Sequence, residues 1–97
     1  MLVYVCLAKW TQKGIENLKD SPSRLEAARK VAKSVGGEIK QFYYTMGRYD
    51  MVAVVECPDH EAATKFALTV AGAGAVRMET LPAIPDTRAA EIIKGLP

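Results

Sequence analysis

The chain has 97 residues, which fits a single domain, and nearly half of them are hydrophobic, which is enough for a small core. Its formal net charge is +2 and no run of lysine or arginine is long enough to follow a phosphate backbone, so we expect no nucleic-acid partner. No stretch approaches the roughly 18–20 apolar residues of a membrane span, so we expect no membrane insertion.

The first residues predict a central β-strand that ends at Lys9 and Trp10. Aliphatic side chains alternate there with other apolar or small ones, in the order Val3, Tyr4, Val5, Cys6, Leu7, Ala8. A pattern of period two with both faces apolar is typical of a strand covered on both sides. The segment has neither a basic leading region nor a small-residue cleavage site, so we interpret it as a strand rather than a signal peptide.

A short helical turn and a longer helix follow. Thr11 is placed to cap the turn and Ser21 to cap the helix, in which Pro22 suits the first position. Gly36 ends the helix, because glycine adopts the left-handed backbone conformation without steric cost. Residues three and four apart give this helix one apolar face, formed by Leu25, Ala28, Ala32 and Val35.

The middle of the chain predicts a β-hairpin and a second helix. Residues 38–46 are rich in aromatic and β-branched side chains, "GRYD" at 47–50 forms the turn, and residues 51–57 form the next strand. Asp59 is placed to cap a helix that ends in the glycine-rich segment 72–74. Its inner face holds Ala63, Phe66, Ala67 and Val70.

The last part of the chain predicts a strand and a terminal helix. Residues 75–84 are predicted to form a strand, and Pro82 near its end suits an edge position because proline cannot donate to a strand ladder. A short helix over 86–95 follows, with Asp86 as its cap. Its apolar stripe, formed by Ala89, Ile92 and Ile93, needs a surface to rest on.

The element order β-α-β-β-α-β predicts an α+β, ferredoxin-like fold. Right-handed crossovers give a four-stranded antiparallel sheet of order 4-1-3-2 with both helices on one face. We expect one domain over 1–97, with a core over 1–84 and a tail helix over 86–95. Covering the bare apolar face at roughly 25 cal/mol per Å² is favourable by many kcal/mol before association costs. We therefore predict a sheet-to-sheet homodimer, the arrangement called a dimeric α/β barrel.

Few residues suit metal or redox chemistry. Cys6 and Cys57 are too far apart for a CxxC motif, and we interpret them as reduced, buried thiols of a cytoplasmic protein. His60 is the only histidine, so a metal site built on imidazoles needs several chains; we interpret it as an exposed first-turn residue. We expect no metal, no cofactor and no catalytic residue.

Three blocks of sequence, in order, resemble the GYD-domain family, small bacterial and archaeal proteins without an agreed function. They are "YVCLAKWTQKGI", "SRLEAARKVAKSVGGEIKQFYYTMGRYDMVAVVE" and "GAVRMETLPA", and together they span almost the whole chain. The motif that names the family is present as Gly47, Tyr49 and Asp50, with Arg48 between the first two.

The chain more distantly resembles the ligand-sensing domain of Lrp/AsnC-type transcription regulators. That resemblance implies dimerisation through the sheets and, in larger rings, amino acids bound between dimers. No helix-turn-helix segment precedes the domain here, so we expect no DNA-reading half. Dimeric α/β barrels also include cofactor-independent monooxygenases and small isomerases, whose catalytic histidines or acids have no clear counterpart in this sequence.

One end of the predicted sheet gathers the candidate ligand-binding residues. The first strand ends there, the hairpin turns there and the fourth strand begins there, which brings together Lys9, Trp10, Gly47, Tyr49, Asp50 and Arg77. If these residues form a small-ligand site, Arg77 or Lys9 binds an anion, and the rings of Trp10 and Tyr49 form the walls. If these residues are structural instead, Gly47 permits a positive φ, Asp50 bonds to nearby backbone and Tyr49 packs at a subunit contact. Trp10 then packs in the core or at an interface, and Arg77 forms a salt bridge between subunits.

Two functions remain open. The leading hypothesis is a non-catalytic homo-oligomeric module that binds a small metabolite, for which we expect a pocket between subunits. The alternative is a cofactor-independent monooxygenase or isomerase, for which we expect a closed cavity in each protomer with at least one titratable group. Aromatic residues placed to line such a cavity, between the helices and the sheet, are Tyr4, Phe42, Tyr43, Tyr44 and Phe66.

Overall fold

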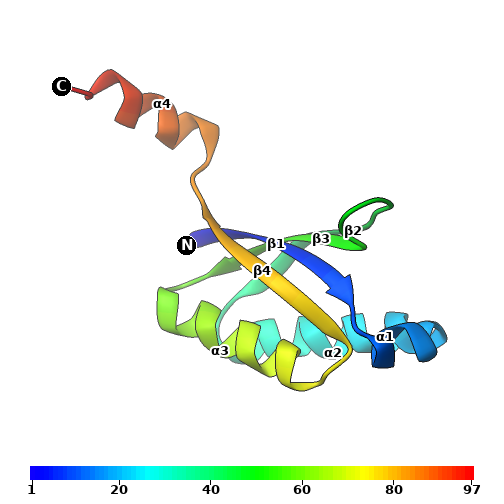
Figure 1. Cartoon of the computed structure of the whole chain (residues 1–97). Coiled ribbons are helices and arrows are strands. Elements are labelled where there is room, and N and C mark those ends of the chain that lie inside the picture. The colour runs from blue at the N-terminus through cyan, green and yellow to red at the C-terminus, as the bar shows by residue number, and fades with distance from the viewer.

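The computed structural model describes residues 1–97 as a four-stranded sheet with helices on one side and a helical arm at the C-terminus (Figure 1). The order of the elements is the predicted one, with a short α1 and a 3-10 turn η1 after the first strand. Their bounds are β1 (Leu2–Trp10), α1 (Gln12–Glu16), η1 (Leu18–Asp20), α2 (Ser21–Ser34), β2 (Glu38–Tyr44), β3 (Met51–Cys57), α3 (His60–Gly72), β4 (Val76–Ala83) and α4 (Asp86–Lys94).

The sheet has the order β2-β3-β1-β4 with every neighbouring pair antiparallel, which is the predicted order 4-1-3-2 read from the other edge. Val5 lies at its centre, opposite Val54 on β3 and Leu81 on β4. Strand β4 is an edge strand, so Pro82 lies where a missing backbone donor costs least.

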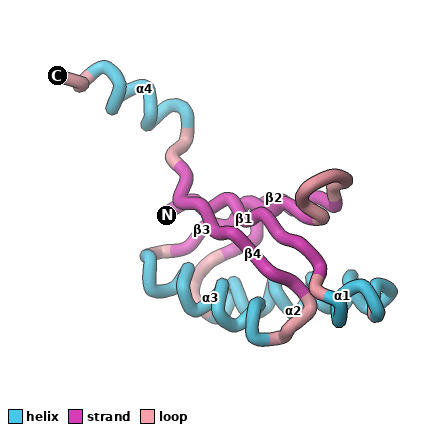
Figure 2. Tube along the Cα trace, viewed as in Figure 1, coloured by secondary structure: helices cyan, strands magenta, loops and turns pink.

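The two faces of the sheet differ in burial. Tyr4, Cys6 and Ala8 are buried on the face that α2 and α3 cover (Figure 2). Val3, Val5 and Leu7 alternate with them and remain half-exposed, because no element of this chain packs over them. The prediction that β1 is covered on both faces is therefore wrong for the single protomer. We call the uncovered side the outer face.

Helix ends follow local signals, with one shift at α2. The Thr11 hydroxyl group accepts from Gly14 N at 3.2 Å and the Asp59 carboxylate from Ala62 N at 2.8 Å, as predicted for caps. Ser21 is not the cap of α2. Because η1 leads directly into this helix, Asp20 occupies the cap position and Ser21 is already helical, with φ −55° and ψ −44°. Gly36 follows α2 with φ +83°, as expected.

The terminal helix α4 extends away from the rest of the chain (Figure 1). Every residue of it except Ala89 is exposed, including Ile93 at 63%. Pro85 is its cap rather than Asp86, since the extended backbone of Pro85 precedes the first helical residue, and Asp86 makes no capping hydrogen bond. None of the helices is both long and apolar enough to cross a membrane.

Candidate functional site

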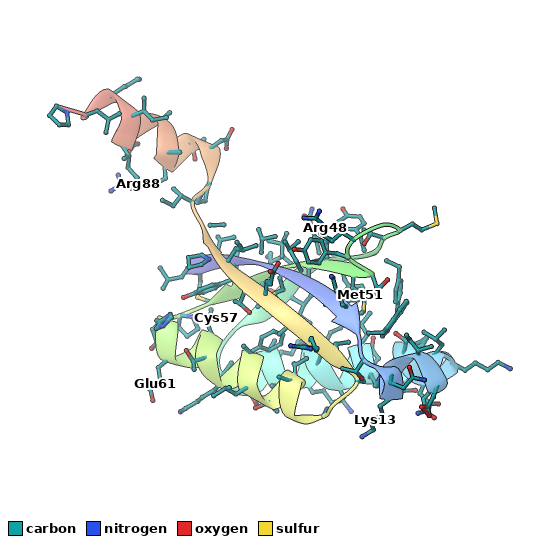
Figure 3. The ribbon with its side chains drawn as sticks, in the orientation of Figure 1. Lys13, Arg48, Met51, Cys57, Glu61 and Arg88 are labelled. Atoms are coloured by element: carbon teal, nitrogen blue, oxygen red, sulfur yellow. The ribbon has the colours of Figure 1, made fainter.

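The "GRYD" turn is closed by hydrogen bonds within the hairpin. Thr45 N donates to Asp50 O at 2.8 Å, and the Thr45 hydroxyl group donates to Tyr49 O at 2.6 Å. Gly47 lies at the tip with φ +113°, a conformation that favours glycine, and it is exposed. Arg48 lies on the side of the sheet away from α2 and α3 (Figure 3). The turn is therefore a braced projection at one end of the sheet.

Asp50 fastens this turn to the end of β1. Its backbone N–H donates to Ala8 O at 2.9 Å, and its carboxylate accepts from Trp10 N at 3.1 Å. Neither Lys9 nor Arg77 forms an ion pair with it. The Asp50 carboxylate thus completes the backbone pairing where the β1–β3 ladder ends.

Tyr49 joins the polar residues at the rim of the outer face. Its hydroxyl group donates to the Glu79 carboxylate at 2.6 Å, and Lys9 Nζ lies 5.5 Å from the centre of its ring. The hydrogen bond to Glu79 is the main cause that raises the pKa of Tyr49 above its ordinary value. Arg77 is exposed and lies opposite Lys9 in the β1–β4 register. These groups form a mixed-charge rim able to contact an anionic or polar ligand.

Trp10 lies on the other side of the sheet from Lys9, because successive residues of a strand point to opposite faces. Its ring stacks on Tyr44 with centroids 6.3 Å apart, and the Tyr44 hydroxyl group is 2.9 Å from Ser21 Oγ. The six candidate residues therefore do not form one pocket within the protomer. Lys9, Tyr49 and Arg77 belong to the outer rim, and Trp10 belongs to the interior.

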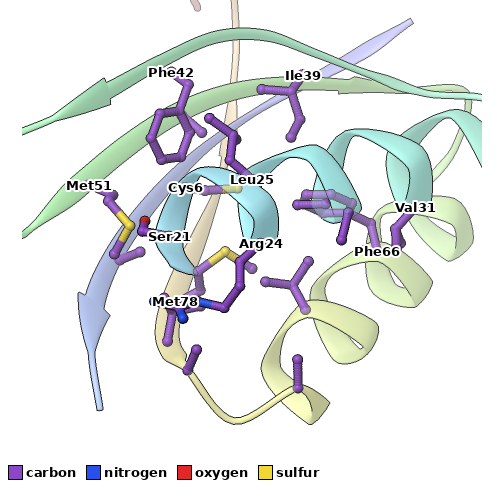
Figure 4. A pocket seen from close by; sticks show the side chains of 18 of the residues that line it. Cys6, Ser21, Arg24, Leu25, Val31, Ile39, Phe42, Met51, Phe66 and Met78 are labelled. Carbon is purple, nitrogen blue, oxygen red and sulfur yellow. The ribbon is translucent and has the colours of Figure 1, made fainter. Parts of the chain in front are cut away.

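A cavity of about 320 Å³ lies between the sheet and helices α2 and α3 (Figure 4). Phe42 and Phe66 line it, and Phe66 also belongs to the buried core cluster. Tyr4, Tyr43 and Tyr44 do not: Tyr4 is part of the packed core, and Tyr43 lies opposite Val52 on the outer face. Of the lining residues, 17 of 20 are hydrophobic, so the cavity suits an apolar occupant.

Arg24 is the functional candidate that the sequence analysis missed. It lines the cavity; Nη1 donates to Asn17 O at 2.9 Å, while Nη2 is fully buried without a hydrogen-bond partner. Trp10 Nε1, which belongs to the same lining, is also buried and unpartnered. Spacing places Arg24 on the inward side of α2, since it lies three residues after Ser21 and four before Ala28, but spacing does not reveal that Nη2 is buried.

Burial keeps both thiols from acting as activated nucleophiles, and the histidine lies at the surface. Cys6 and Cys57 are buried and unpaired with each other. Burial raises the pKa of the Cys6 thiol to about 11 and also raises the pKa of Cys57. His60 is exposed at the start of α3, as expected. No group of three histidine, cysteine or acidic side chains is placed to hold a metal ion.

The element order and sheet topology define a ferredoxin-like α+β protein, and two solved structures share this fold. The crystal structure of TTHA0845 from Thermus thermophilus has a TM-score of 0.57 and 22% identity, over 88% of this chain and 95% of that one. The crystal structure of FFRP-DM1 has a TM-score of 0.60 and 17% identity, over 87% of this chain and 100% of that one. At these identities the likenesses show the fold alone.

The chain belongs to the GYD domain family, whose model matches residues 4–93. The resemblance carried by the three sequence blocks is therefore confirmed. A relative from Thermus thermophilus, named glutamine synthetase and cystathionine beta-lyase binding protein, is 33% identical over 86 residues. The match covers 88% of this chain and 90% of that protein.

Proposed function

We propose that this chain is a non-catalytic homodimeric module that works by binding other molecules. The observation that carries the proposal is the uncovered outer face. Aliphatic side chains from the three strands that meet there lie side by side at its centre: Val3, Val5 and Leu7 on β1, Val52 and Val54 on β3, and Leu81 on β4. Contiguous exposed apolar surface of this kind marks an interaction site in soluble proteins.

A second copy of the chain is the partner that fits this surface best. The apolar centre is bounded by both charge signs, with Lys9 and Arg77 beside Glu79 at one end. Two such faces can bury their apolar centres against each other while opposite charges meet at the edges. In that dimer the rim residues Lys9, Tyr49 and Arg77 come near the partner subunit, which is where we place the small-metabolite site.

The polar groups of the chain support binding rather than catalysis. The Asp50 carboxylate bonds to a backbone N–H and the Tyr49 hydroxyl group bonds to Glu79. The cavity, which would hold the substrate of an enzyme, is lined by Cys6 and Arg24 as its titratable residues. A thiol with a pKa of about 11 stays protonated at neutral pH, and a guanidinium group is a donor only. Neither can take a proton from a substrate.

The name of the Thermus relative suggests the kind of macromolecule that this module binds. That relative is named for binding glutamine synthetase and cystathionine beta-lyase, and it matches most of this chain. We therefore propose that this chain also binds a partner enzyme. The two buried, unpaired thiols fit the reducing environment of the cytoplasm, where we place the protein.

Sedimentation equilibrium at micromolar concentration tests the proposal. We expect the mass of two chains for the parent and of one chain for Val5→Glu, because the new carboxylate lies at the centre of the outer face opposite Val54 and Leu81. Leu68→Glu is the matched control: this side chain is 68% exposed on α3, away from the sheet, so the variant stays dimeric.

The same variants test the binding of enzymes. Glutamine synthetase and cystathionine β-lyase from the source organism are immobilised, and the parent and both variants are passed over them. Binding by the parent and by Leu68→Glu supports the proposal. A monomeric parent with the outer face in contact with water contradicts the dimer, and a dimeric parent that binds neither enzyme contradicts the partner class.

A further inference from the structure

The cavity between the sheet and the helices has an apolar body and two unused hydrogen-bond donors. Its volume of about 320 Å³ is at the lower end of the range of small-molecule sites, roughly 300–1,000 Å³. Most of the wall is aliphatic or aromatic, contributed by both helices and by the sheet (Figure 4). An occupant of this cavity therefore has a largely apolar body.

The two donors are Arg24 Nη2 and Trp10 Nε1. Both are fully buried, and neither has a hydrogen-bond partner in the protein. Buried donors in folded proteins are nearly always paired, so two of them in the lining of one cavity point to an acceptor that occupies it. The guanidinium group also carries a positive charge, and the lining contains no aspartate or glutamate to balance it.

Both donors are held in place by the fold. Arg24 is anchored through Nη1, which donates to Asn17 O at 2.9 Å. Its Nη2 has no hydrogen-bond partner in the protein. The Trp10 ring is fixed by its stacking on Tyr44. Arg24 also lies near the N-terminus of the 14-residue helix α2, where the helix dipole adds positive potential. The guanidinium charge and the helix dipole both favour negative charge at this end of the cavity.

We propose that each protomer binds an apolar carboxylic acid in this cavity. Its carboxylate accepts from Arg24 Nη2 and Trp10 Nε1, and its hydrocarbon body contacts side chains such as Phe42, Phe66 and Met78. The inference concerns the inside of one protomer. It is therefore independent of the outer face, of the rim site and of the dimer.

Titration calorimetry with three eight-carbon probes tests the charge preference of the cavity. Octanoate, octanol and octylammonium each contain eight carbons in an unbranched chain and differ mainly in the head group. For the full-length protein at pH 7 we expect octanoate to bind about tenfold or more tightly than octanol, and octylammonium to bind most weakly. Trp10 is the only tryptophan, so its fluorescence should change on addition of octanoate.

Variants of the protein test which side chains cause the preference for octanoate over octanol. Arg24→Gln should bind octanoate and octanol equally, because the apolar body still fits but the charge is lost. Lys30→Gln is the matched control, since it removes an exposed charge from the same helix outside the cavity, and it should keep the preference. Ala28→Leu should weaken both probes by filling the cavity.

Three results overturn the proposal: equal affinity of the parent for octanoate and octanol, no binding of either probe, or an undiminished preference in Arg24→Gln. If Arg24→Gln fails to fold, as judged by circular dichroism, Trp10→Phe replaces it. This variant keeps an aromatic ring and loses the Nε1–H donor, so octanoate should bind several-fold more weakly while octanol is unaffected. An unchanged affinity for octanoate in Trp10→Phe also overturns the proposal.

Discussion

The hydrogen bond between Tyr49 and Glu79 makes ionisation of the phenol unfavourable. The Tyr49 hydroxyl group is the donor at 2.6 Å, so its proton is held by the carboxylate, and the negative charge of Glu79 opposes the formation of a second one. The pKa of Tyr49 is therefore raised from 10.0. The pair links the hairpin turn to β4 across the end of the sheet.

We predict that tyrosinate formation separates Tyr49 from the other three tyrosines. In a spectrophotometric titration of the folded parent, one tyrosine should ionise at a higher pH than an ordinary phenol. In Glu79→Gln this late ionisation step should move down toward pH 10. Because the folded-state pKa is the higher one, the stability that Tyr49 contributes is complete below about pH 10 and is lost as the pH rises through the folded-state pKa.

Glu56→Gln is the control for this titration. Glu56 is half-buried on β3 opposite Val3, on the same face of the sheet, and forms no ion pair or side-chain hydrogen bond with a tyrosine. Its replacement should leave the late step in place. If Glu79→Gln titrates like the parent, the bond between Tyr49 and Glu79 does not persist in solution.

At the scale of elements, one carboxylate links the β2–β3 hairpin to the end of β1. Asp50 ends the β1–β3 ladder: its N–H pairs with Ala8 O and its side chain replaces the next backbone acceptor for Trp10 N. Residue 50 is therefore a structural link in the family motif.

We predict that Asp50→Ala lowers the free energy of unfolding by about 1–2 kcal/mol, because Trp10 N loses its charged acceptor in a half-buried place. Urea unfolding followed by circular dichroism measures the change. Asp20→Ala is the control, since its carboxylate is exposed and makes no capping hydrogen bond, and it should change stability by less than about 0.5 kcal/mol. Equal losses in the two variants contradict this role for Asp50.

The helices and strands were predictable from sequence where neighbouring residues alone determine the periodicity and the caps. The alternation around Cys6, the cap at Asp59 and the left-handed Gly36 are set by neighbouring residues, and the structure confirms them. The caps at Ser21 and Asp86 were each wrong by one residue. Ser21 lies within a continuous helical path from η1, and Pro85 supplies the extended backbone before α4. Helix ends respond to the preceding turn, which sequence spacing describes poorly.

The placement of the candidate residues at one end of the sheet was predictable, but their grouping was not. The topology correctly placed Lys9, Trp10 and Asp50 at one end of the sheet. Because successive strand residues point to opposite faces, however, Lys9 lies on the outer face and Trp10 in the interior. The buried Nη2 of Arg24 could not be inferred from sequence, because a long cationic side chain on a helix normally extends to water. Only the hydrogen bond from Nη1 to Asn17 O and the place of Arg24 in the cavity lining reveal that position.

On the scale of the whole molecule, apolar surface remains uncovered in two places. One is the outer face, and the other is the stripe of α4, where Ile92 and Ile93 are exposed. The chain extends over 51 × 31 × 17 Å, a thin shape in which one layer of helices covers one side of one sheet. A second protomer against the outer face would add the missing layer, so we expect association to raise the stability of the folded chain.

We predict that the thermal midpoint of the parent rises with protein concentration. When a dimer unfolds to two chains, its free energy of unfolding rises by about 1.4 kcal/mol for each tenfold increase in protein concentration. For a cooperative unit of two such chains, this raises the thermal midpoint by roughly 2–4 °C. Differential scanning calorimetry over a hundredfold range measures the shift, and Val5→Glu should show none because it unfolds as a monomer. A constant midpoint in the parent means that each chain folds alone, and the outer face then needs another explanation.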